Sequence, residues 1–69
     1  MLNIKNLRKG DLIKPLENNT GKGVMIGDIF RVYLTGYTFG ENWADIINLE
    51  GTCQTSISMG FDDKKWELI

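Results

Sequence analysis

The sequence predicts an all-β domain, a single small and strongly bent barrel of about five short antiparallel strands that occupies residues 1–69. Three observations support this fold class. Eight glycines divide the 69 residues into short segments. Glycine or β-forming residues interrupt every window that is long enough for a helix. Within residues 9–34, a turn, a short strand, a glycine-bearing loop and a longer strand follow one another, as at the start of a bent barrel.

The five strands are expected at residues 11–16, 27–35, 43–49, 54–59 and 65–68. The first strand ends near Pro15, because proline cannot donate to a sheet ladder. The second strand has the clearest alternation of side chains, with one expected face formed by Phe30, Val32 and Leu34 and the other by Ile29, Arg31 and Tyr33.

The later strands are less regular. In the third, Ala44 and Ile46 oppose a set that is not polar either, namely Trp43, Asp45, Ile47 and Leu49. This predicts a bulge or a covered outer face. In the fourth, the residues expected to face the core are Cys53, Thr55, Ile57 and Met59. A tight turn is expected at Glu50 and Gly51. A short turn, with one turn of 3₁₀ helix as the alternative, is expected at residues 60–64.

Residues 18–23 are dense in turn-forming residues and predict a loop. Lys22 lies between two glycines, as in a phosphate-binding loop. That motif needs a glycine where Leu16 stands, a Ser or Thr where Gly23 stands, and a following helix. We therefore interpret the segment as a hairpin-type loop. Asp11 and Asp28 both follow glycine, so we expect their carboxylates to accept backbone N–H groups in turns.

Several of these segments resemble SH3-like small barrels, and the first half resembles the KOW-type motif within that class. The matching segments are Lys9-Gly10-Asp11-Leu12-Ile13-Lys14, Thr20-Gly21-Lys22-Gly23, Ile29-Phe30-Arg31-Val32, Ala44-Asp45-Ile46-Ile47-Asn48-Leu49-Glu50-Gly51 and Trp66-Glu67-Leu68-Ile69. The last of these is similar to the short final strand that pairs beside the first strand in such barrels. The resemblance implies a binding module rather than an enzyme. The size and composition are also similar to those of small prophage or mobile-element proteins.

The composition argues against several kinds of site. The chain has no histidine, which excludes Cys/His zinc sites and histidine acid–base catalysis. Cys53 is the only cysteine and is interpreted as a small packing residue. No segment has the alternating oxygen ligands of a calcium loop. We therefore expect no enzymatic activity, no metal site and no cofactor.

The apolar segments are short throughout. No run approaches the length of a membrane span, and the first residues lack the apolar region of a secretory signal. We therefore expect a cytoplasmic protein that does not associate with a membrane.

Four aromatic residues crowd into residues 33–43, most of them in an expected loop. We expect at least one ring to enter the core, and Phe39 with Trp43 could plug the open end of the barrel. Exposed rings on a loop are a common means of gripping a partner. The segment is thus predicted to bind a protein, with the anchors Tyr33, Tyr37, Phe39 and Trp43 and the polar rim Glu41 and Asp45.

The strands beside this segment offer further apolar surface. Strands two and three are apolar on both faces, although a barrel of this size has one core. This leaves some of their side chains for a partner or a second copy of the chain, the candidates being Ile29, Tyr33, Ile47 and Leu49.

Nucleic-acid binding is the alternative function. Residues 1–34 carry a net charge of +3, whereas residues 35–69 carry −4. A basic edge along the first hairpin would track phosphates through Lys9, Lys14, Lys22 and Arg31. The same unevenness also fits an ordinary solvated surface whose charges are intermixed by folding.

Overall fold

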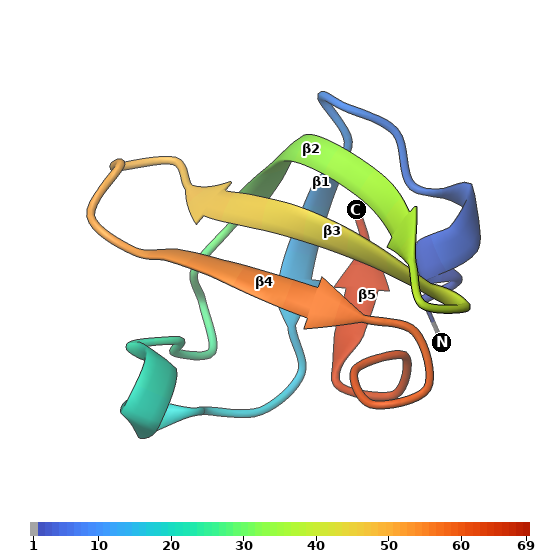
Figure 1. The fold of residues 1–69 in the computed structure, drawn as a ribbon. Coiled ribbons are helices and arrows are strands. Elements are labelled where there is room, and N and C mark those ends of the chain that lie inside the picture. Colours follow the sequence, from blue (N-terminus) through green and yellow to red (C-terminus); the bar gives the residue numbers. More distant parts are fainter. Residues whose placement is uncertain (1) are drawn as a thin grey trace.

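The structure, a computed structural model, describes residues 2–69 and contains five antiparallel strands in one sheet (Figure 1). The strands are β1 (Leu12–Pro15), β2 (Phe30–Thr38), β3 (Glu41–Asn48), β4 (Gln54–Ser58) and β5 (Trp66–Leu68). Their order across the sheet is β4-β3-β2-β1-β5. The two helical segments are single 3₁₀ turns, η1 (Ile4–Asn6) and η2 (Thr20–Lys22). The predicted all-β class and strand number are therefore confirmed.

The longest strand, β2, is irregular in the middle. Its pairing with β3 shifts register between Val32 and Leu34. A bulge of this kind reverses which face the following side chains occupy. Phe30 and Val32 are buried, but Leu34 lies on the outer face and is 49% exposed. The prediction that Leu34 shares a face with Phe30 and Val32 was wrong, and the bulge that was expected in the third strand lies in β2 instead.

The aromatic segment is a hairpin rather than a loop. β2 continues through Thr38, three residues beyond the predicted end of the strand, and β3 begins at Glu41. Only Phe39 and Gly40 remain in the turn. The expectation that most of residues 33–43 form a loop was wrong, because β2 and β3 remain paired as far as Thr38 and Glu41.

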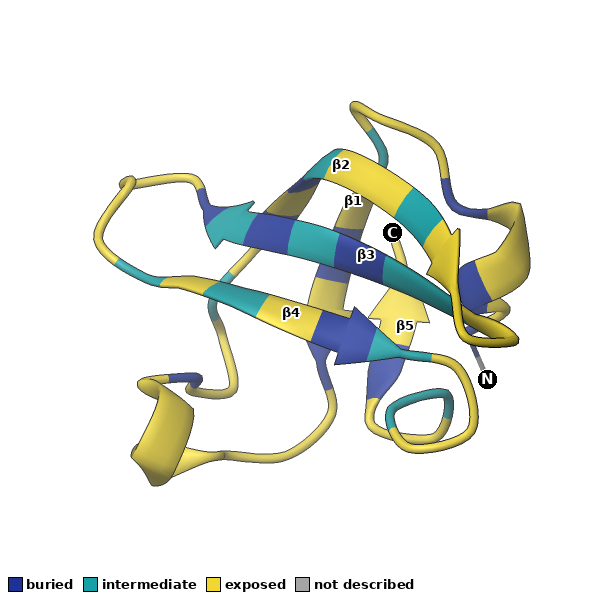
Figure 2. Cartoon of the chain, in the orientation of Figure 1, coloured by how far each residue is buried: buried dark blue, intermediate teal, exposed yellow. Residues whose placement is uncertain are grey.

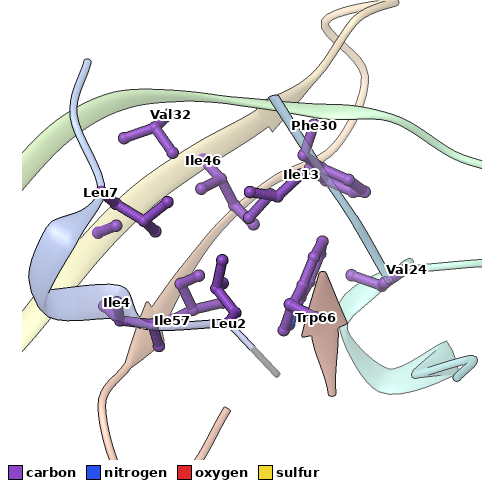
Figure 3. Close-up of a cluster of buried hydrophobic side chains, with 11 residues drawn as sticks. Leu2, Ile4, Leu7, Ile13, Val24, Phe30, Val32, Ile46, Ile57 and Trp66 are labelled. Atoms are coloured by element: carbon purple, nitrogen blue, oxygen red, sulfur yellow. The ribbon is translucent and has the colours of Figure 1, made fainter. Parts of the chain in front are cut away.

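The core is a single cluster between the sheet and the N-terminal residues (Figure 3). Phe30 and Trp66 meet edge to face within it, with ring centroids 5.1 Å apart. The N-terminal segment around η1 adds three buried aliphatic residues, Leu2, Ile4 and Leu7. None of the four rings of residues 33–43 is buried there, so both core expectations for that segment were wrong. Phe30 at the start of β2, Trp66 of β5 and the N-terminal segment contribute to the core instead.

The loop that carries η2 folds against the edge of β4. Asn19 and Val24 pair across its base, as expected of a hairpin-type loop. Lys22 Nζ donates to the carbonyl of Ser56, 3.4 Å away. Cys53 Sγ donates to the carbonyl of Lys22 at 3.2 Å, and Cys53 packs against the core as predicted. The loop therefore covers part of a strand edge that would otherwise be open to pairing.

Acidic side chains hold several turns in place. The carboxylate of Asp11 accepts the backbone N–H of Arg8 at 2.9 Å, and that of Asp28 accepts the N–H of Met25 at 3.3 Å. Both predicted structural roles are confirmed. In the turn before β5, where a turn was also expected, Asp62 accepts the N–H of Ser58 at 2.8 Å.

Candidate functional site

The turn between β2 and β3 has an unusual residue in its first position. Phe39 and Gly40 have φ angles of 51° and 80°, which is the geometry of a two-residue type I′ turn. Such turns favour Asn-Gly because both central residues need a positive φ. Phe39 is the only described residue other than glycine with a positive φ. A bulky residue in this conformation costs about 1 kcal/mol.

The side chain of Phe39 recovers none of this free energy within the chain, because it is fully exposed. Tyr37, two residues before it, is 68% exposed. Its hydroxyl lies 3.9 Å from the position that a Cβ on Gly40 would take, so the ring reaches toward the turn. Glu41, on the other side of the turn, is also exposed. We call Tyr37, Phe39 and Glu41 the hairpin tip; it is coloured as exposed in Figure 2.

The other predicted anchors lie on the outer face of β2, β3 and β4. The indole of Trp43 covers Gly36, where an added Cβ would overlap the ring. Its Nε1 donates to Thr38 Oγ1 at 3.1 Å. The indole is therefore held within the hairpin and only partly exposed.

Tyr33 and Asp45 are also held by the neighbouring strands. The hydroxyl of Tyr33 accepts a hydrogen bond from Gln54, and the carboxylate of Asp45 accepts one from Ser56. Both bonds cross to β4 and tie the sheet together. The structure thus splits the six predicted residues into two groups of three, a free hairpin tip and an outer face already engaged by other residues.

A second candidate surface is an apolar groove beside β1. Its wall is formed by Lys14, Pro15, Leu16, Ile26, Gly27, Asp28, Ile29 and Ile69, around a volume of about 540 Å³. Four of these are exposed aliphatic side chains, Leu16, Ile26, Ile29 and Ile69. We call this surface the apolar groove.

Two more exposed leucines extend the apolar groove. The amide of Leu49 donates to the carbonyl of Ile29 at 3.0 Å, and the amide of Ile69 donates to that of Leu12 at 3.0 Å. Leu49 and Leu12 therefore continue the apolar surface at its borders. The sequence interpretation included Ile29 and Leu49 but missed Leu16, Ile26 and Ile69. One sequence feature could have indicated this surface: Ile26 is an aliphatic residue next to Gly27, in a turn where a polar residue would be usual.

Elsewhere among residues 2–69, two open hollows of about 250 Å³ each adjoin Leu2 and Asn3. A cleft between the η2 loop, β4 and β5 is lined by Val24, Ile57 and Trp66 among others, but its volume is about 20 Å³. That is roughly the space of one water molecule. Among residues 2–69, no three His, Cys, Asp or Glu side chains come together as a metal site would require. No helix in this part of the chain is long and apolar enough to cross a membrane.

The four basic residues of the alternative function are all exposed but lie in three places. Lys14 and Arg31 share the outer face of β1 and β2, because Arg31 pairs with Leu12 two residues along from Lys14. Lys9 lies in the turn before β1. Lys22 is hydrogen-bonded to β4. Glu67 pairs directly with Lys14 across β1 and β5, so a negative charge interrupts the basic surface.

Comparison with known proteins returns no match: no protein-family model, no curated protein and no solved structure is significantly similar to the chain. The geometry of its own residues is therefore the basis for a functional proposal.

Proposed function

We propose that the chain is an SH3-like barrel that serves as a non-catalytic protein-interaction module and contacts its partner through the hairpin tip. The exposed, left-handed Phe39 carries the proposal. The barrel assignment is supported by the strand order, in which β5 lies beside β1 and the long β2 pairs with both β1 and β3. The η2 loop, folded against the β4 edge, supports it further.

The argument from Phe39 is energetic. Its backbone conformation destabilises the isolated chain, and its exposed ring gains nothing from packing. Asparagine at the same position would form the turn without that strain. An aromatic ring at such a position repays its cost when a partner buries it, because a phenylalanine side chain removes about 150–250 Å² of surface from water.

Comparison with the neighbouring aromatic residues supports the choice of Phe39 as the main contact. Trp43 and Tyr33 have partners within the sheet, so substituting them would damage the fold together with any binding. Tyr37 and Glu41 have side chains free of such bonds to other strands among the described residues. They place a second ring and a polar group around Phe39, the arrangement that aromatic hot spots and their rims adopt.

The proposal can be tested by photo-crosslinking at one position. Phe39 is replaced by a photoreactive phenylalanine analogue in the full chain, which is irradiated in a host lysate divided into nuclease-treated and untreated halves. The matched control carries the same analogue at Phe61, a ring that is 71% exposed in the turn after β4. We expect a protein adduct at position 39 that survives nuclease and is absent at position 61.

Two outcomes would contradict the proposal. One is that positions 39 and 61 give the same adducts or none. The other is that every adduct disappears with nuclease and nucleic acid is recovered. The second result would favour the basic residues Lys9, Lys14, Lys22 and Arg31 as the binding surface, and its expected signature is a steep loss of binding with salt.

A further inference from the structure

We propose that the partner of the hairpin tip is a second copy of this chain, whose apolar groove receives Phe39 in a head-to-tail contact. This inference rests on the proposed function and adds the identity of the partner. It follows from the presence, on one small molecule, of an unburied aromatic ring and an unfilled apolar groove.

The groove has the chemistry that a phenyl ring requires. Four exposed aliphatic side chains line it, and its volume of about 540 Å³ leaves room for one aromatic side chain with neighbouring turn atoms. Ile26 and Ile69 are the most exposed of the four. Large contiguous apolar patches are uncommon on monomeric soluble proteins, and those that occur often mark interaction sites.

The two surfaces cannot meet within one chain. The groove includes Ile29, just before β2 begins, and Phe39 directly follows the end of β2. The two positions therefore lie at opposite ends of the longest strand, as Figure 1 shows, in a molecule whose greatest extent is 29 Å. Only another copy can bring a hairpin tip to this groove. Such a contact joins two different surfaces, so a pair of bound copies still offers one free tip and one free groove.

One pair of opposite charges can meet across the contact, Glu41 at the hairpin tip and Lys14 in the groove. Glu41 is the only charged residue of the hairpin tip and is exposed. Lys14 lines the groove and is exposed. The groove also contains Asp28, whose carboxylate accepts the N–H of Met25, and Glu67 pairs with Lys14. The attraction between Glu41 and Lys14 thus guides orientation and contributes little affinity.

The size of the contact predicts a weak association. A stable dimer buries about 800 Å² on each partner, a substantial part of the 4596 Å² surface of this chain. One hairpin tip in one groove buries less than that. We therefore expect dissociation constants between about 10 µM and about 1 mM, and chains of copies that lengthen with concentration.

Sedimentation equilibrium of the full chain over that concentration range is the test. Two variants each remove one surface: Phe39→Asn removes the ring and keeps the turn, and Ile26→Asp places a charge in the groove. We expect the unmodified chain to associate with rising concentration and each variant alone to stay monomeric. An equimolar mixture of the two variants should form dimers and nothing larger, because one intact tip and one intact groove remain.

Growth of the unmodified chain beyond two copies separates a head-to-tail contact from a symmetric one, which is complete in a dimer. Phe61→Asn is the control and should associate like the unmodified chain. Ile69→Asp repeats the groove test, and far-ultraviolet circular dichroism checks that each variant is folded. The inference is overturned if the unmodified chain stays monomeric at about 1 mM, or if the mixture of folded variants does not dimerise. If the chain is monomeric while position 39 crosslinks to another protein, the inference fails and the proposed function stands.

Discussion

The two turns at the ends of β3 are built on different principles. The turn into β4 is held by Asn48, which is only 5% exposed. Its Oδ1 accepts the N–H groups of Thr52 and Cys53 at 2.8 and 2.9 Å, and its Nδ2 donates to Thr52 Oγ1 at 2.9 Å. Across the turn from β2, the described side-chain bond joins Trp43 Nε1 to Thr38 Oγ1 rather than to the turn backbone, and Phe39 adds strain. One turn therefore stabilises the fold, whereas the other presents side chains to the surroundings.

The difference between the two turns is the basis for proposing that the hairpin tip binds a partner. Buried polar groups with every bond satisfied stabilise the chain that contains them. A strained, exposed aromatic residue does the reverse, and under the proposed function a partner that buries the ring would offset the strain. The four predictions below test this contrast, from the largest expected effect to the smallest.

Asn48→Ala should destabilise the chain most, by about 3 kcal/mol, because it leaves two turn N–H groups without their acceptor. Urea unfolding measures this change. Asn42→Ala is the matched control on the same strand, since its side chain makes one weak contact to the sulfur of Met59 at 3.8 Å. Equal stability of the two variants would show that the β3–β4 turn does not depend on Asn48.

Gly36→Ala should destabilise the chain by about 2 kcal/mol, because the added methyl overlaps the indole of Trp43 and forces it away. Tryptophan fluorescence during unfolding reports both the stability and the displaced ring. Gly21→Ala serves as control, because its new Cβ would meet nothing closer than 3.6 Å. If Gly36→Ala unfolds like the unmodified chain, Trp43 is not seated on the hairpin.

Phe39→Asn should raise the free energy of unfolding by about 1 kcal/mol, because asparagine tolerates the left-handed conformation. The same substitution should abolish self-association. Thermal unfolding and sedimentation measured on one preparation would test both effects. A variant that is less stable than the unmodified chain would mean that the exposed ring contributes to the fold, which would remove the contrast between the two turns.

Glu41→Gln should leave stability unchanged within about 0.5 kcal/mol, as for most surface substitutions. It should weaken self-association about threefold, since it removes the attraction to Lys14 at the rim. High salt should reduce the association of the unmodified chain by a similar factor and leave the variant unaffected. A larger loss would place Glu41 at the centre of the contact rather than at its rim.

Local patterns were sufficient to predict most of the strands. The alternation around Phe30 and Val32, the proline at position 15 and the turn residues after Asn18 are each visible within a few neighbouring residues. Predicted strand ends lay within about three residues of those observed, which is the usual limit of such patterns. The turn roles of Asp11 and Asp28 were predictable for the same reason, because the bonds of their carboxylates are local.

The candidate site could be predicted only in part, because burial depends on partners that are distant in sequence. Residues 33–43 contain four rings that look equivalent in sequence. The bulge after Val32 decides which face of the sheet the next side chains occupy. The indole of Trp43 packs over Gly36, and Gln54 donates a hydrogen bond to the hydroxyl of Tyr33. These contacts leave Phe39 and Tyr37 as the free rings. The apolar groove was harder still, because residues 14–16, 26–29 and 69 meet only when β1 pairs with both β2 and β5.

The sequence by itself determined that this protein is a small all-β domain of five antiparallel strands, because strand alternation and glycine turns act over short distances. Only the tertiary structure decided which apolar residues form the core and which remain outside it. The N-terminal segment fills space that the aromatic segment was expected to fill, and one bulge turns Leu34 outward. Which side chains become buried depends on competition between distant segments for one small core. A pattern of neighbouring residues contains no information about that competition.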